Sequence, residues 1–270
     1  MLISISLAWA RRQQAGSPSS KSARVHSSPF LIADKGAIAP DATNITVNSL
    51  SDVANGSDGL CTLREAIIAA SNNVASGAAA GECAAGSSSG SDIINATGII
   101  GTIDLSSELP QINSNITING PGSSQLTVHR NSGGVYRIFS ITDSGTFTVS
   151  GLTVSNGRAP DGTSPSDGGN GGGIQNGVGA MTLNDVTVTG NSAGNGVFGA
   201  NGGVGGHGGG IYSTGSLTIS NSSIANNAAG PGGNANINGG DGGRGGGIYS
   251  GGGLTMNNCS VTNNSSGNGG

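Results

Sequence analysis

The residues able to do acid–base chemistry in the second half of this chain are few and scattered. His207 stands alone between glycines, and the acids after residue 130 are Asp143, Asp161, Asp167, Asp185 and Asp241. Breaking a glycosidic bond needs two carboxylates held close together, one acting as acid and the other as base or nucleophile. These aspartates form no adjacent pair, and all but Asp185 lie in expected turns or loops. We therefore predict no catalytic site and no enzymatic activity in this chain.

Calcium binding is a second possible role for the loop aspartates. Asp161, Asp167 and Asp241 carry the oxygen atoms that Ca²⁺ prefers, and loop carbonyls would complete a shell. The stretch GGDGGRGGG around Asp241 does not match the calcium-binding nonapeptide GGxGxDxUx, because it lacks the apolar partner. We predict no metal site and no cofactor.

Three cysteines allow one disulfide. Cys61 and Cys83 flank one expected helix and its loop, so they are able to pair, and a disulfide suits an exported protein. Sequence alone does not prove this pairing. Cys259 aligns with Val186 and Ser222 in the repeated segments after residue 170, which indicates a small, buried, free side chain and no nucleophile or metal ligand.

One amphipathic helix is expected, from Thr62 to about Val74. Thr62 and Glu65 have the spacing of a capping box, in which the hydroxyl accepts from a backbone N–H and the carboxylate reaches back. The expected buried face repeats at helical spacing. It consists of Leu63, Ala66, Ile67 and Ala70.

Arg64 lies inside the same motif, and we expect it to form an ion pair with Asp52 or Asp58. Ion pairing by Arg64 and capping by Glu65 are structural roles. The helix itself would cover the first coil of a repetitive β structure, whose apolar interior and strand edge would otherwise meet water.

Three segments after residue 170 repeat one pattern. Each opens with GGGI, at Ile174, Ile211 and Ile248, spaced 37 and 37 residues apart. Each closes with an asparagine, spaced 36 and 37 residues apart, at Asn191, Asn227 and Asn264. A period of this length is typical of a solenoid, in which each repeat buries its apolar face only against its neighbours.

The alternation of side chains within each repeat predicts three short strands per coil. Inward-facing residues should stack in columns, for example Met181 on Leu217 on Leu254. The closing asparagines should form a ladder at a bend, where asparagine tolerates left-handed backbone geometry. Tyr212 and Tyr249 should point outward, either to pair across coils or to hold a sugar ring.

Further strands are expected at 45–50, 92–95, 102–105, 115–119, 125–129, 137–141 and 146–155. The fold class is therefore all-β, a parallel β-helix solenoid with an N-terminal amphipathic capping helix. Loops 158–170, 192–207 and 228–244 are almost wholly Gly, Asn, Ser and Ala, and should project from one side of the rod.

Composition agrees with a thin core and glycine-rich loops. Glycine contributes 53 of 270 residues, while charged residues make up only 9% and aromatic residues 3%. After residue 35 there are five Arg, no Lys and 13 acids, a formal net charge of 5 − 13 = −8. A basic stripe is absent there, which argues against nucleic acid as a partner.

The expected organisation has three parts. Residues 1–42 are a flexible leader, in which Arg11 and Arg12 follow the apolar MLISISLAWA, the reverse of a secretory signal. Residues 43–110 form the cap, and residues 111–270 form the coils. No segment has transmembrane length. The coils stop inside a glycine loop at Gly270, so we expect further coils or an anchor beyond it and end-to-end self-association of this chain.

The motif CTLREAI at 61–67 resembles the CSLREA motif of a family of exported bacterial proteins. The surrounding ITVNS, the downstream Cys83 and SELPQINSNITINGPG fit the same family. The GGGI and [VI]xxN pairs resemble the GGA[ILV] and FxxN repeats of polymorphic outer-membrane proteins, with Val or Ile in place of Phe. These resemblances cover residues 44–266. They imply a right-handed β-helix of the pectin-lyase type, exported to the cell surface.

Gly206-His207-Gly208 also resembles the GHG element of polygalacturonases, which share this fold. The Asn-Thr-Asp, Asp-Asp and Arg-Ile-Lys elements that accompany it there are missing from this sequence, so we interpret His207 as a loop residue.

Together these observations predict an exported, non-catalytic cell-surface rod for adhesion, wall association or display. Its partner would be a surface polysaccharide or a host or cell-surface ligand. The alternative is a carbohydrate-active β-helix enzyme, a polysaccharide lyase or glycoside hydrolase, whose catalytic acids lie outside these 270 residues.

Overall fold

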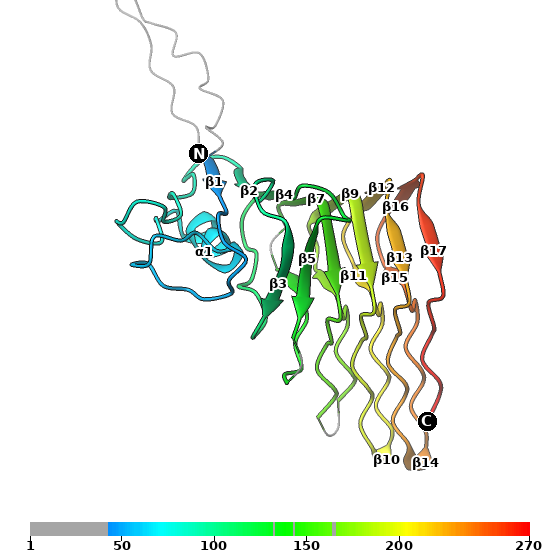
Figure 1. Cartoon of the computed structure of the whole chain (residues 1–270). Coiled ribbons are helices and arrows are strands. Elements are labelled where there is room, and N and C mark those ends of the chain that lie inside the picture. The colour runs from blue at the N-terminus through cyan, green and yellow to red at the C-terminus, as the bar shows by residue number, and fades with distance from the viewer. Residues whose placement is uncertain (1–42, 132, 143, 164–165) are drawn as a thin grey trace, which may run out of the picture. The chain divides into compact units, whose positions relative to one another are not determined.

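Parallel strands stacked coil upon coil make up almost all of the described structure, so the predicted parallel β-helix is confirmed (Figure 1). The computed structural model describes residues 43–131, 133–142, 144–163 and 166–270. The leader predicted at 1–42 lies outside the described residues.

The elements are β1 (Thr43–Thr46), α1 (Leu63–Asn72), β2 (Asp92–Asn95), β3 (Gly101–Leu105), β4 (Ile116–Asn119), β5 (Leu126–Arg130), β6 (Phe139–Ile141), β7 (Thr146–Ser155), β8 (Ile174–Asn176), β9 (Ala180–Thr189), β10 (Gly199–Asn201), β11 (Ile211–Ser213), β12 (Leu217–Ser220), β13 (Ser223–Ala225), β14 (Ala235–Asn238), β15 (Ile248–Ser250), β16 (Leu254–Asn257) and β17 (Ser260–Thr262).

The strands form two long parallel sheets along the rod. One runs β1-β2-β4-β7-β9-β12-β16, joined by β3 and β5 beside β7 and by β13 and β17 beside β9. The other runs β6-β8-β11-β15. Strands β1, β2 and β3, within the segment expected to be the cap, already stack on the next coils of the rod.

The inward columns follow the predicted register. Met181 pairs with Leu217, which pairs with Leu254, and the column of Val188, Ile224 and Val261 is likewise in register. Side chains of the inner coils are fully buried, as Leu217 shows at 1% exposed. Leu254 is 44% exposed because the last coil contacts another coil on one side only.

The GGGI isoleucines stack as expected, with Ile211 in register with Ile174 on one side and Ile248 on the other. Phe139 of β6 continues this column one coil earlier. Ile174 and Ile211 are completely buried, but Ile248 is only half-buried. The prediction that all three are buried is therefore wrong for Ile248, for the same reason as for Leu254.

Three backbone positions in each GGGI repeat have a positive φ. The first of them is the glycine that opens GGGI in every repeat, as at Gly208 with φ +65°. The bend before the closing asparagine uses Gly190, Asn226 and Asn263. Left-handed geometry was expected at the ladder asparagines themselves, which is wrong by one residue. The preceding residue turns the chain, and this turn points the ladder side chain inward.

The helix α1 begins where the capping box predicts, with Thr62 as its N-cap. It ends at Asn72, two residues earlier than expected, because Asn73 adopts a left-handed conformation with φ 57°. Its buried face contacts β1 and β2. This face contains the four predicted residues Leu63, Ala66, Ile67 and Ala70, together with Ala69.

The first strand departs from its predicted bounds of 45–50. β1 covers Thr43–Thr46, and the chain then leaves the sheet toward the cap. Asn48 bonds to the cap instead: its backbone N–H donates to the Cys61 carbonyl at 3.0 Å, its Oδ1 accepts the Cys61 backbone N–H at 2.7 Å, and its Nδ2 donates to the Gly81 carbonyl at 2.9 Å. A residue that ties two cap segments together is not free to pair in the sheet.

α1 is 10 residues long, and among the described residues no helix combines the length and apolar character needed to cross a bilayer.

The glycine-rich loops project from one side of the rod, as predicted, and extend side by side to β10 and β14 at the lower edge of Figure 1. We call the described residues of 158–170, 192–207, 228–244 and 265–270 the blade. The loops at 192–207 and 228–244 each have an outgoing and a returning arm. In the outgoing arm that begins at residue 192, the backbone N–H of every third residue donates to a backbone carbonyl of the next coil. Ala193 donates in this way to Ala228 at 2.9 Å, and Gly196 donates to Pro231 at 2.8 Å. A three-residue period is that of an extended, polyproline-type helix.

The outgoing and returning arms of the blade are also bonded to each other. One chain of backbone hydrogen bonds runs through Gly169, Gly194, Gly206, Gly230, Gly243 and Gly267, each link measuring 2.8 or 2.9 Å. The blade is thus ordered by backbone hydrogen bonds. The sequence had predicted only that these loops project from one side of the rod.

Glycine is required in the blade because the backbones touch. A Cβ atom on Gly230 would lie well inside van der Waals contact with the carbonyl oxygen of Gly194. The same clash recurs one coil on, between Gly267 and Gly230.

We expect Gly230→Ala to separate the blade arms around it. Amide hydrogen exchange of Gly206, Gly230 and Gly243 should rise by at least tenfold, about 1.4 kcal/mol of lost protection, while amides of the strands remain protected. Gly253→Ala is the matched control, since a Cβ at Gly253 meets nothing within 4 Å. Equal exchange in the two variants would contradict close packing of the blade.

Candidate functional site

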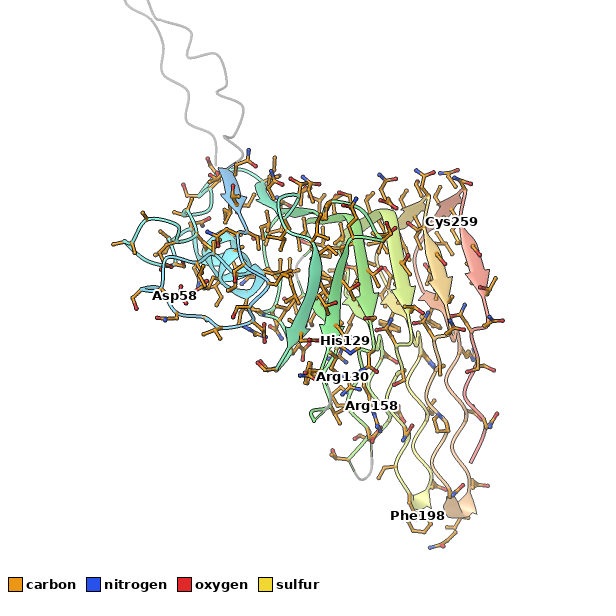
Figure 2. All side chains as sticks on the ribbon, viewed as in Figure 1. Asp58, His129, Arg130, Arg158, Phe198 and Cys259 are labelled. Atoms are coloured by element: carbon orange, nitrogen blue, oxygen red, sulfur yellow. A yellow bond between two sulfur atoms is a disulfide. The ribbon has the colours of Figure 1, made fainter. Side chains whose placement is uncertain are left out.

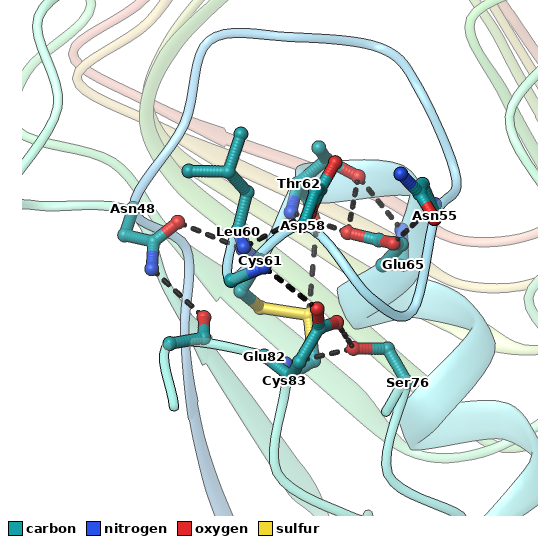
Figure 3. The surroundings of a disulfide bond; sticks show 12 residues. Asn48, Asn55, Asp58, Leu60, Cys61, Thr62, Glu65, Ser76, Glu82 and Cys83 are labelled. Carbon is teal, nitrogen blue, oxygen red and sulfur yellow. Dashed lines mark hydrogen bonds between the residues drawn. A yellow bond between two sulfur atoms is a disulfide. The ribbon is translucent and has the colours of Figure 1, made fainter. Parts of the chain in front are cut away.

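The disulfide expected between Cys61 and Cys83 is present, with Cα atoms 4.7 Å apart (Figure 3). It links the start of α1 to the loop after the helix. Glu82 beside it accepts from the Gly59 backbone N–H at 2.9 Å and from the Ser76 hydroxyl at 2.8 Å. The loops around the disulfide are therefore also cross-linked by side chains.

The predicted capping box is present and does more than cap. Thr62 Oγ1 accepts the Glu65 N–H at 3.2 Å, and Glu65 Oε2 accepts the Thr62 N–H at 3.0 Å. The second carboxylate oxygen of Glu65 accepts the Asn55 N–H at 2.6 Å. Glu65 is only 3% exposed, so its carboxylate is buried among donors that satisfy it.

Arg64 pairs with Asp52, one of its two predicted partners. The contact is bidentate, with Nε and Nη2 lying 2.9 and 3.0 Å from the two carboxylate oxygens. The same guanidinium donates to the carbonyls of Ser107 and Glu108 at 2.9 and 2.8 Å. Arg64 thereby fastens the cap to the segment after β3.

The closing asparagines form the predicted ladder. Asn191 Nδ2 donates to Asn227 Oδ1 at 2.9 Å, and Asn227 Nδ2 donates to Asn264 Oδ1 at 3.0 Å. The amides of Asn191 and Asn227 also donate to carbonyls of their own and the preceding coil, such as Val188 at 2.9 Å from Asn227, and Asn264 Nδ2 donates to the Ile224 carbonyl at 2.8 Å. Gly157 continues the column, because its N–H donates to Asn191 Oδ1 at 2.7 Å.

The residues described so far make intramolecular contacts that hold the cap and the coils together. A column of aromatic residues on the outer face of the second sheet faces the solvent instead. Gln175, Tyr212 and Tyr249 lie in register on β8, β11 and β15. The two tyrosine rings stack with centroids 5.2 Å apart and planes 9° apart. Tyr212 and Tyr249 are half-buried, and within the described residues neither phenol hydroxyl has a hydrogen-bond partner.

His207 completes this column, which the sequence analysis missed. Its ring stacks on Tyr249 with centroids 4.9 Å apart and planes 21° apart. Nδ1 accepts the Arg244 backbone N–H at 3.0 Å, and the His207 N–H donates to Asn170 Oδ1 at 2.7 Å. Residues 170, 207 and 244 are 37 apart. This spacing was the available signal that His207 belongs to a column. We define Gln175, His207, Tyr212 and Tyr249 as the aromatic column.

The surroundings of the column favour the neutral forms of His207 and Tyr212. Burial lowers the pKa of His207, and the nearby Arg244 lowers it further. Burial and then Tyr249 raise the pKa of Tyr212. With Nδ1 occupied as an acceptor, the neutral imidazole carries its proton on Nε2. The column therefore offers neutral rings, a carboxamide and phenol hydroxyls to a ligand.

Two of the three aspartates considered as calcium ligands, Asp161 and Asp167, hold loops together, and Asp241 is exposed. Asp161 accepts the Asn195 N–H at 2.8 Å and pairs with Arg158, and Asp167 accepts the Val204 N–H at 2.8 Å. Asp185 accepts the Ser123 hydroxyl at 2.7 Å. Within the described residues, which exclude Asp143, His, Cys, Asp and Glu form no group of three that could hold a metal ion.

Cys259 is free, as predicted, and its thiol donates to the carbonyls of Asn257 and Ile219 at 3.2 and 3.4 Å. It is half-buried, so its predicted burial is wrong. Its place in the last coil leaves one side uncovered.

Comparison with known proteins adds no relative: the chain matches no protein-family profile, no curated protein and no solved structure.

Removing the cap disulfide should destabilise the protein. The bond closes a loop with a sequence separation of 22 residues, for which a loss of about 3 kcal/mol is expected. Denaturant unfolding of the double variant Cys61→Ala/Cys83→Ala, followed by circular dichroism, measures it. Cys259→Ala is the control and should change stability by less than about 1 kcal/mol. A double variant as stable as this control would refute a stabilising role.

Removing the central asparagine of the ladder should lower the free energy of unfolding by more than the loss of one small polar side chain suggests. Asn227→Ala removes the amide that donates to the carbonyls of Val188 and Ala225, and it removes the oxygen that accepts from Asn191 Nδ2. We expect a loss of about 2–4 kcal/mol in denaturant unfolding. The exposed Asn234 provides the control, because Asn234→Ala should stay within about 0.5 kcal/mol of wild type. The ladder would lose its assigned role if both variants unfolded alike.

Proposed function

We propose that this chain is an exported, non-catalytic rod, displayed at a cell surface, that binds a neutral surface polysaccharide along the aromatic column. The observation that carries the proposal is the column itself. Stacked rings with free hydroxyls stand on the outside of a rigid sheet, where they contribute little to the core.

The ring edges and hydroxyls suit a sugar chain. Because the ring faces stack on one another, the ring edges supply the apolar area that a sugar chain contacts, and the polar tips remain wet and available for hydrogen bonds. Gln175 adds an amide that both donates and accepts. The strand spacing of about 4.8 Å places successive column members at intervals close to the length of one sugar unit.

Export is supported by the cap. A disulfide persists in oxidising compartments outside the cytosol, and Cys61–Cys83 joins two segments of the cap that stands over the first coil. The resemblance of CTLREAI to the motif of an exported family points the same way. Secretion and surface attachment are parts of this proposal.

Affinity electrophoresis through gels containing neutral polysaccharides tests the binding. We expect retardation of the wild-type chain, and a rise in Kd of about three- to tenfold in Tyr212→Ala or Tyr249→Ala, which corresponds to roughly 0.5–1.5 kcal/mol per aromatic contact. Phe198→Ala is the matched control, since Phe198 is an aromatic side chain that is 61% exposed and lies far from the column at the end of the blade (Figure 2).

Two results would overturn the proposal. One is unretarded migration of the wild-type chain in every neutral polysaccharide tried. The other is retardation that Phe198→Ala weakens as much as the tyrosine variants do, because binding would then follow exposed aromatic rings in general.

A further inference from the structure

A second repeating surface lies on the first sheet, away from the aromatic column. Five threonines from consecutive coils are in register, each paired with the next across β4, β7, β9, β12 and β16. These strands run side by side along the upper edge of Figure 1, whereas the blade extends to the lower edge. We call Thr117, Thr148, Thr182, Thr218 and Thr255 the threonine face.

The hydroxyls of this face are available. Within the described residues none of the five threonine side chains has a hydrogen-bond partner. The first four are half-buried by their neighbours above and below, and Thr255 is exposed. Each therefore presents one methyl group and one unpartnered hydroxyl to the solvent.

The array is also rigid and neutral. β-Branched side chains are stiff at χ1, and the in-register backbone fixes their spacing at about 4.8 Å between coils. Two residues further along the strands, about 6.6 Å away, stands a parallel column without a charged residue. It contains Asn119, Ser150, Asn184, Ser220 and Asn257.

These properties define the ligand. A ligand that uses the whole array repeats at about the spacing of the coils and exchanges hydrogen bonds with a hydroxyl at every repeat. The two columns contain no aromatic ring on which a sugar would stack. Ice presents oxygen atoms at repeats close to that of the coils, and each of its water molecules both donates and accepts.

We propose that the threonine face binds the surface of ice. A stiff array loses little conformational entropy when it binds, and its methyl groups fill the spaces between ordered waters while the hydroxyls join them. This inference is independent of polysaccharide binding, because it concerns another sheet and other residues.

Inhibition of ice recrystallisation by the purified 270-residue chain tests it, together with the fraction of protein that enters a slowly growing ice hemisphere. We expect the wild-type chain to slow crystal growth and to enter the ice. Thr182→Arg and Thr218→Arg should each abolish most of both effects, because a hydrated guanidinium stands above the plane of the array. Gln175→Arg places the same side chain on the second sheet and should leave both effects unchanged.

Melting temperatures close to that of the wild type establish that the arginine variants remain folded. Because two threonines are replaced separately, the test still works if one of the two variants does not fold. The proposal is overturned if the wild-type chain behaves like an unrelated protein of equal concentration, or if both threonine variants act on ice as the wild type does. It is also overturned if Thr182→Arg reduces polysaccharide retardation instead. Tyr212→Ala should retain full activity on ice, which separates this proposal from the previous one.

Discussion

In-register hydrogen bonding between consecutive coils is the constraint on which the rest of this structure depends. Strand β12 pairs residue for residue with β9 on one side and β16 on the other. In the last three coils the cross-coil neighbour of an inward side chain is therefore the residue 36 or 37 positions along the chain, about 4.8 Å away. Apolar columns, the asparagine ladder, the aromatic column and the threonine face are all consequences of this one register. A residue type that packs well on itself is favoured at each position.

The protein meets the demand for backbone hydrogen bonds in two ways. In the strands, aliphatic columns fill the interior while the edges pair. In the blade there is almost no side chain to bury, and pairing of glycine backbones in several directions replaces the core. Both solutions explain the composition, since neither needs aromatic residues and the second needs close approach of main chains, as at Gly194 and Gly230.

Features marked by side chains could be predicted from the sequence. The period of Ile174, Ile211 and Ile248 gave the columns, the Thr62 and Glu65 pair gave the helix start, and the positions of Cys61 and Cys83 allowed the disulfide. Order within the blade left no such mark, because hydrogen bonds between glycines involve only backbone atoms. The stacking of His207 depends on the path of its loop, which composition does not reveal.

Smaller errors have similar causes. The predicted first strand begins two residues late and runs too far because Asn48 serves the cap, and that contact joins residues distant in sequence. The left-handed positions were expected at the ladder asparagines because asparagine is common there, yet burial of Asn191 and Asn227 requires the turn to come one residue before. Tertiary contacts determine both the end of the first strand and the position of the left-handed residue, and such contacts cannot be read from a local sequence pattern.

The hydrogen-bonded blade changes what a long glycine-rich loop means for the resistance of this protein to proteolysis. Loop tips with small and polar residues are the usual sites of proteolytic nicking. A protease binds its substrate as an extended strand, pairing with the substrate backbone and gripping a side chain. In the blade the N–H and C=O groups of residues such as Gly206 and Gly230 are already paired with neighbouring arms, and glycine offers no side chain to grip. Cleavage there requires an arm to detach first, so the part of the chain with the least core is shielded by its own backbone.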